Sequence, residues 1–179
     1  MGKQVLILTS SLRADSNSDG LAEAFARGAR EAGHQVEQVS LKGKKLSFCK
    51  GCMACLKTQK CAIQDDAVEL AEQIGAAEVL VLVSPVYYYS LSGQLKTLLD
   101  RCNPLYASDY QFRDVYFLAA AAEDDKRAME GPVKAIEGWV ECFEQARLAG
   151  TVFAGGVDAP GEIRGSGALE EAYQMGRKV

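Results

Sequence analysis

Four short runs of almost continuous apolar residues constrain the fold of this chain more than any other feature. They cover residues 4–10 (QVLILTS), 78–84 (EVLVLVS), 115–122 (VYFLAAAA) and 150–157 (GTVFAGGV). Parallel strands covered by helices on both faces show this pattern, whereas half-exposed strands alternate between apolar and polar residues. A fifth run, residues 34–41 (HQVEQVSL), has fewer apolar residues and suits an edge of the sheet.

Helical periodicity fills the gaps between these runs. The expected apolar faces are Leu21, Phe25 and Ala29 in 18–32; Ala67, Ala71 and Ile74 in 66–75; Leu91, Leu95, Leu98 and Cys102 in 91–102; and Val133, Ile136, Val140 and Phe143 in 132–147. A last helix is expected over 168–177. This alternation predicts one α/β domain over residues 1–179, a flavodoxin-like three-layer sandwich with five parallel strands in the order 2-1-3-4-5.

Charge and composition exclude several classes of partner. The formal net charge of -4 comes with no basic block, which disfavours nucleic acid. No apolar run approaches the roughly 20 residues that cross a bilayer, and the first residues lack the features of a signal peptide. We therefore expect a cytoplasmic protein, in which clustered cysteines serve metal or redox chemistry more than disulfides. Lys96 and Arg101 are interpreted as surface charges, and Cys102 and Cys142 as buried structural cysteines.

The loop after the first strand has the composition of a phosphate site. In a sheet of this order ligands bind beyond the carboxyl ends of the strands, and TSSLRADSNSDG (9–20) lies there directly before a helix. Its hydroxyls and Arg13 suit a terminal phosphomonoester at the helix N-terminus. The glycine motifs of P-loop and Rossmann proteins are absent, which disfavours nucleoside triphosphates and dinucleotides. The alternative is a simple N-cap by Ser16, Asn17 or Ser18.

The loop after the third strand, within SPVYYYSLSGQLKTLLDR (84–101), places three tyrosines at the same edge. A planar heterocycle needs aromatic or apolar walls together with backbone donors. Tyr87, Tyr88 and Tyr89 could supply the walls, and the backbone of residues 86–90 could supply the donors. The alternative is that the tyrosines pack at a helix start or at a subunit interface.

Four cysteines within FCKGCMACLKTQKCAIQDD (48–66) form a third motif, Cys-x2-Cys-x2-Cys-x5-Cys. Its first part is similar to the ferredoxin pattern that gives three thiolates to one 4Fe–4S cluster, and a fourth cysteine follows in the same loop. The motif comprises Cys49, Cys52, Cys55 and Cys61. The alternatives are structural zinc, a thiol–disulfide pair, or a cluster-free loop that serves as an apolar flap or subunit contact.

These three motifs, in this order, resemble the NADPH-dependent FMN reductase and iron-sulfur flavoprotein group. The resemblance implies non-covalent FMN and a 4Fe–4S cluster on the four cysteines. The FMN phosphate is expected on Ser11, Arg13, Ser16, Asn17 and Ser18, and the ring against Pro85, Val86, Tyr87, Tyr88, Tyr89, Ser90, Ala121, Ala122 and Glu123. The chain departs from the family pattern at two places. Ser10 stands where relatives often have glycine, and alanines follow the fourth strand where many relatives have glycines.

The resemblance implies an FMN-dependent oxidoreductase that passes electrons from NAD(P)H or ferredoxin to a flavin, quinone or other small acceptor. Because FMN carries the chemistry, no residue is assigned as catalytic. The alternatives are an electron-transfer carrier without turnover of its own and a scaffold that has lost FMN and binds only a partner. A homodimer or homotetramer is expected from the family, with a neighbouring chain completing the flavin pocket.

Overall fold

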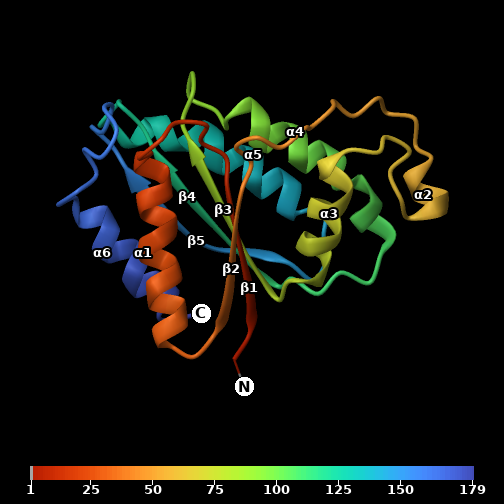
Figure 1. The fold of residues 1–179 in the computed structure, drawn as a ribbon, viewed down its shortest axis with the longest axis horizontal. Coiled ribbons are helices and arrows are strands. Elements are labelled where there is room, and N and C mark those ends of the chain that lie inside the picture. Colours follow the sequence, from red (N-terminus) through yellow and green to blue (C-terminus); the bar gives the residue numbers. More distant parts are fainter. Residues whose placement is uncertain (1) are drawn as a thin grey trace.

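Five parallel strands form the central layer of the computed structural model, which describes residues 2–179 (Figure 1). They are β1 (Gln4–Thr9), β2 (Gln35–Ser40), β3 (Val79–Pro85), β4 (Asp114–Ala120) and β5 (Arg147–Ala154), in the order β2-β1-β3-β4-β5. The predicted flavodoxin-like fold and strand order are confirmed. Within the described residues no helix combines the length and apolarity that a membrane crossing needs.

Helices cover both faces of the sheet. Figure 1 shows α1 (Asn17–Glu31) and α6 (Gly167–Gly176) on one face, and α3 (Asp66–Ala76), α4 (Gly93–Arg101) and α5 (Glu130–Val140) on the other. The remaining elements are the short helix α2 (Cys55–Thr58) and the 3-10 turns η1 (Asn103–Ala107) and η2 (Lys126–Met129). Both α2 and the segment that leads to it extend beyond the helical layers (Figure 1).

Successive side chains of the central strands serve two separate cores. Leu6 and Leu8 of β1 pack with α3 and α4, whereas Val5 and Ile7 of the same strand pack with α1. All four are at most 3% exposed. The apolar runs are continuous because both alternating sets of side chains are buried, as expected for a covered parallel sheet.

The strand β5 is the exception to the predicted burial. It lies at the edge opposite β2, and Thr151 and Phe153 of the predicted run 150–157 remain partly exposed. The prediction that this run is buried on both faces was therefore wrong. An edge strand has a neighbouring strand on one side only, so less of its surface is covered.

The helix α5 ends at Val140, earlier than the 147 predicted. Phe143 is still buried, because the chain turns and packs this ring against Phe112 and Trp139 at centroid distances of 5.1 and 4.7 Å. The same turn leaves Cys142 exposed, so its interpretation as a buried cysteine was wrong. Cys102 is buried as predicted, and burial raises the pKa of its thiol to about 12.

Candidate functional site

A cavity of about 190 Å³ lies at the carboxyl ends of β1, β3 and β4, where three distant segments of the chain meet. We call it the strand-end cavity. Its lining includes most of the residues predicted to contact FMN, namely Ser11, Arg13, Ser16, Asn17, Ser18, Pro85, Val86, Tyr87, Ala121 and Ala122. Tyr88, Tyr89, Ser90 and Glu123 do not line it and are exposed.

The N-terminus of α1 forms the polar end of this cavity. Ser16 is the N-cap, and its Oγ accepts a hydrogen bond from the Asp19 amide at 3.2 Å and lies 2.9 Å from Ser18 Oγ. The N-cap interpretation is therefore confirmed for Ser16, which lines the cavity as well. The first amides of a helix have no intrahelical acceptor and carry the positive end of its dipole, so this end of the cavity favours an anion.

The loop after β5 closes over the same end and was missed in the sequence. Arg13 Nη1 donates to the Asp158 carbonyl at 2.7 Å, and Asn17 Nδ2 donates to the Ala159 carbonyl at 2.9 Å. Asn17 Oδ1 also accepts from the Ile163 amide at 3.1 Å, so its amide braces this loop. Val157, Asp158 and Pro160 line the cavity. Their place in the sequence, directly after the last strand and so at the ligand-binding edge of the sheet, was the feature from which this contact could have been predicted.

Ser10 connects the end of β1 to two other elements. It is 1% exposed, and its Oγ donates to the Val83 carbonyl at 3.0 Å. Ser92 Oγ, at the N-cap of α4, donates to Ser10 Oγ at 2.8 Å. The hydroxyl therefore links the end of β1 to β3 and to the start of α4.

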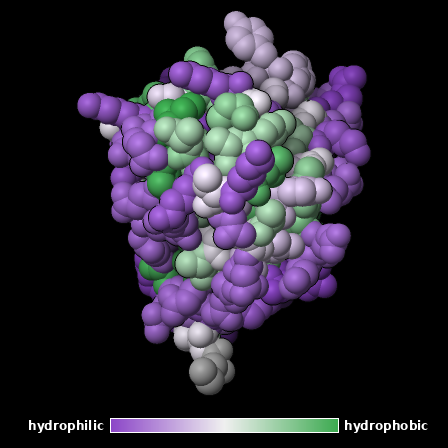
Figure 2. All heavy atoms as spheres, turned by 90° about the vertical axis from the view of Figure 1, so that its right-hand side faces the viewer, coloured by the Kyte–Doolittle hydropathy of each residue, from purple (hydrophilic) through white to green (hydrophobic). Residues whose placement is uncertain are grey.

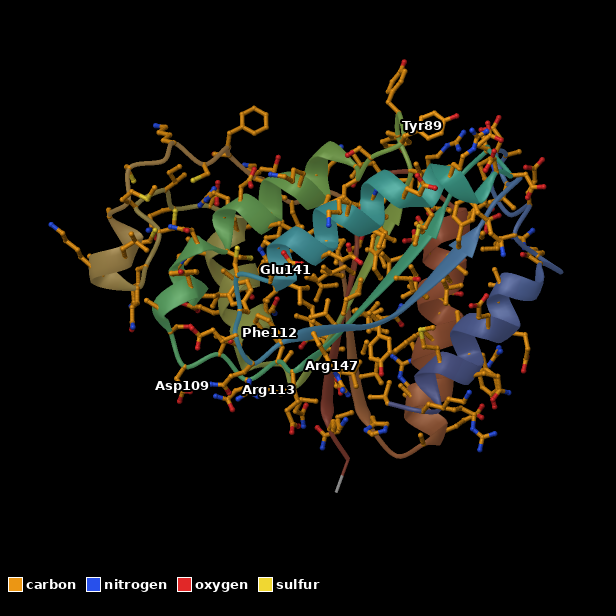
Figure 3. The ribbon with its side chains drawn as sticks, turned by 180° about the vertical axis from the view of Figure 1, so that it is seen from behind. Tyr89, Asp109, Phe112, Arg113, Glu141 and Arg147 are labelled. Carbon is orange, nitrogen blue, oxygen red and sulfur yellow. The ribbon has the colours of Figure 1, made fainter. Side chains whose placement is uncertain are left out.

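The tyrosines form a tight turn at this edge. Tyr87 and Ser90 exchange two backbone hydrogen bonds of 3.1 and 3.0 Å, and Tyr88 and Tyr89 between them have φ of 48° and 57°. Such turns favour asparagine and glycine, because other residues are strained in the left-handed region. Figure 3 shows Tyr89 at the end of the molecule opposite to Arg113 and Arg147. Tyr87 lines the cavity, whereas Tyr88 is fully exposed.

A second cavity, of about 340 Å³, is lined by all four cysteines of the motif together with Arg101, Asn103 and Pro104. We call it the cysteine cavity, and residues 48–63 the cysteine loop. Cys49 and Cys52 are exposed, Cys61 is half-buried and Cys55 is buried. Asn103 Nδ2 donates to Cys55 Sγ at 3.0 Å. Within residues 2–179 no three Cys, His, Asp or Glu side chains are grouped closely enough for a single metal ion.

The donor set of the cysteine cavity fits a cluster of several metal ions with sulfide. All four cysteines line one cavity, and the Asn103 side-chain amide donates to the sulfur of one of them, as N–H donors do around the sulfurs of iron–sulfur centres. The two cavities have no lining residue in common. Met53 and Leu56 of the cysteine loop are exposed to solvent. Figure 2 shows apolar residues gathered on the side of the molecule where α2 lies.

Arg101 is a buried ion-pair partner, and its interpretation as a surface charge was wrong. Its side chain is completely buried and pairs with Asp65 at 2.8 Å. Asp65, acting against the effect of burial, raises the pKa of Arg101, and Cys61 contributes to the rise. Lys96 is exposed as expected and pairs with Asp100 at 2.6 Å. The sequence pattern does not distinguish Lys96 from Arg101, since neither belongs to the expected apolar face of residues 91–102.

The fold is flavodoxin-like, and the strand-end cavity lies at its switch point. Residues 4–159 match the model of the NADPH-dependent FMN reductase family, and the chain belongs to that family.

Relatives of known name agree with this assignment. An iron-sulfur flavoprotein of Methanocaldococcus jannaschii is 30% identical over 98% of this chain and 95% of its own. Iron-sulfur flavoproteins of Archaeoglobus fulgidus match over about half of their own length, 53% and 44% for two of them.

Two solved structures share the fold at low sequence identity. An NAD(P)H:quinone oxidoreductase from Methanothermobacter marburgensis superimposes with a TM-score of 0.75 at 22% identity, covering 99% of this chain and 97% of its own. An FMN-dependent NADH-azoreductase from Bacillus anthracis, in complex with FMN, gives a TM-score of 0.67 at 16% identity and covers 99% of both chains.

Proposed function

We propose that this chain binds FMN in the strand-end cavity and passes electrons from NAD(P)H or a ferredoxin to a flavin, quinone or other small acceptor. The observation that carries the proposal is one cavity that joins a helix N-terminus, an apolar strand end and a third loop. A polar end beside an apolar wall matches the two chemistries of a flavin mononucleotide. When bound, FMN supplies the transfer of a hydride or of single electrons.

The residues of the cavity divide by chemistry. We assign the phosphate to the buried hydroxyls of Ser11, Ser16 and Ser18, with the charge of Arg13 beside them. Pro85, Val86, Ala121 and Ala122 offer apolar contacts for the ring. Asn17 acts indirectly, because its amide holds the loop after β5 in place.

The cavity is too small to enclose the whole ligand. Pockets that enclose a ligand of this size begin at about 300 Å³, and this one measures about 190 Å³. We therefore expect the ring to extend over the exposed rim formed by residues 87–90, where a neighbouring chain of a homodimer or homotetramer would cover it.

We further propose that Cys49, Cys52, Cys55 and Cys61 hold a 4Fe–4S cluster. Such a cluster, when bound, carries single electrons. The support is that all four thiols line one cavity and that Cys55 already accepts a hydrogen bond from Asn103.

A second function, electron carriage without turnover of a small molecule, is favoured by the exposure of the cysteine loop. Cys49, Cys52 and Met53 are all open to solvent, where a protein partner such as ferredoxin could approach.

One preparation distinguishes these functions. Protein purified anaerobically should carry FMN and about four irons per chain, and should oxidise NADPH or NADH when a quinone is added. Flavin and iron without turnover would support the carrier. Yellow protein without iron would overturn the cluster, and a colourless protein that takes up no FMN would overturn the oxidoreductase.

A further inference from the structure

Arg101 is the last residue of α4, and its buried guanidinium lies at the base of the cysteine loop. Its Nη1 donates to the Ser47 carbonyl and to Asp65 Oδ2, each at 2.8 Å, and its Nη2 donates to the Ile63 carbonyl at 2.9 Å. Ser47 immediately precedes the cysteine loop, and Ile63 is its last residue. One side chain therefore joins both ends of the loop.

Asp65 completes this closure. Its Oδ2 also accepts from the Ser47 amide at 2.8 Å, and its Oδ1 accepts from the Ala67 amide at 3.1 Å as the N-cap of α3. The ion pair thus links α4, α3 and both ends of the loop in one hydrogen-bonded network. Arginine suits this position, because its planar array of donors can engage three acceptors at once, whereas lysine presents a single ammonium group.

One donor of Arg101 takes no part in the closure. Its Nε is buried and has no hydrogen-bond partner in the part of the chain that the structure describes, residues 2–179. Arg101 lines the cysteine cavity together with Cys55 and Cys61. A buried donor without an acceptor calls for an explanation, and an absent ion or group that supplies the acceptor is a common one.

We propose that Arg101 is a positioning residue of the metal site, which closes the base of the cysteine loop so that the four thiols face one cavity before metal enters. With a cluster bound in the cavity, its Nε–H would donate to one of the sulfurs. The second part rests on the proposed cluster, whereas the first part does not. The charge of Arg101 would then stabilise the negative charge that reduction of the cluster adds.

The closure is tested on the reduced, metal-free full chain by timed alkylation, with the rate at each cysteine read by mass spectrometry. In Arg101→Gln we expect Cys55, buried in the wild type, to react about tenfold faster or more, because a released loop exposes it. Buried Cys102 should stay protected and so report an intact fold. The matched control is Lys96→Gln, which removes a cation from the exposed face of the same helix and should leave both rates unchanged.

An unchanged Cys55 rate in Arg101→Gln, with Cys102 protected, overturns the closure. If Cys102 also reacts, Arg101→Gln has lost its fold, and the closure is then tested with Arg101→Lys. Lysine keeps the charge but cannot hold all three acceptors, so Cys55 should react at a rate between those of the wild type and a released loop. A Cys55 rate equal to that of the wild type in Arg101→Lys overturns the closure.

The donor role is tested after reconstitution with ferrous iron and sulfide. The reduction potential of the cluster should become more negative in Arg101→Gln and stay closer to that of the wild type in Arg101→Lys and Lys96→Gln. FMN uptake should not change in any variant, because Arg101 does not line the strand-end cavity. Equal potentials in all four proteins overturn the donor role. A wild type that takes up no iron overturns the cluster and the donor role with it, while alkylation still decides the closure.

Discussion

Asp65 and Arg101 form an ion pair of 2.8 Å in which neither side chain is more than 9% exposed. Burial alone would raise the pKa of Asp65, but hydrogen bonds from Arg101 and from Ser47 outweigh it and lower the pKa from 3.8 to about 2. The hydrogen bonds at the base of the cysteine loop therefore keep the Asp65 carboxylate charged.

The first prediction concerns the effect of acid on this pair. Because the pKa of Asp65 is lower in the folded than in the unfolded chain, the pair contributes its full stability above about pH 5 and loses it as the pH falls toward 2. The loss amounts to about 2 kcal/mol. It is measured by urea unfolding of the metal-free protein between pH 7 and pH 2.

Asp65→Asn is the matched variant, because asparagine can still cap α3. It should cost about 3 kcal/mol at pH 7, since it leaves a buried arginine without its charged partner. Its stability should fall less steeply between pH 5 and pH 2 than that of the wild type. Equal slopes for the two proteins would show that the Asp65 pKa is not lowered in the folded state.

The second prediction concerns the strained tyrosine turn. Replacing Tyr88 by Asn and Tyr89 by Gly should raise the free energy of unfolding by about 1 kcal/mol, because both new residues tolerate the left-handed conformation. FMN should still bind, because its phosphate is assigned to the strand-end cavity, which neither tyrosine lines, but it should bind more weakly, because the ring extends over the rim that both tyrosines form. The KM for a quinone should rise if the turn forms the rim over which the acceptor approaches. Tyr106→Asn, at an exposed tyrosine outside the turn, is the control, and a loss of stability in the double variant would contradict the strain.

The third prediction separates the cysteines by role. Alanine at position 49, 52, 55 or 61 should lower iron and acid-labile sulfide to a small part of the wild-type content, because each removes one thiolate of the set. Cys142→Ala should keep the full content, since Cys142 is exposed and outside the cysteine cavity. Full iron in any of the four variants would remove that cysteine from the ligand set.

The fourth prediction concerns Asn103, which donates to Cys55 Sγ at 3.0 Å. Asn103→Ala should release iron to a chelator about tenfold faster than the wild type, because groups that hydrogen-bond a metal ligand support its binding. The control is Gln111→Ala, because the side-chain amide of Gln111 donates to the Asp109 carbonyl and Gln111 does not line the cysteine cavity. A rate matching that of the wild type would leave Asn103 with no part in holding the metal.

The sequence predicted the architecture well because the apolar pattern that defines it is local. The run in β1 and the spacing of Leu21, Phe25 and Ala29 in α1 correspond directly to buried positions. The strand-end cavity was also largely predictable, since the carboxyl ends of parallel strands meet at one edge.

The remaining features depend on contacts between distant segments. The burial of Arg101 requires Ser47, Ile63 and Asp65 to converge on it, which no local pattern around position 101 reveals. The early end of α5 likewise follows from the packing of Phe143 on Phe112, which then exposes Cys142. Both errors arose where tertiary contacts outweigh helical periodicity.

The central claim, a flavin phosphate at the start of α1, is tested most directly by titrating the flavin-free protein with FMN and with riboflavin, which lacks the phosphate. Arg13→Gln should weaken FMN about tenfold or more, because a charge-assisted hydrogen bond is lost, and should leave riboflavin unchanged. Arg30→Gln, at the far end of the same helix, should alter neither affinity. Equal FMN affinities for wild type and Arg13→Gln would contradict the assigned site.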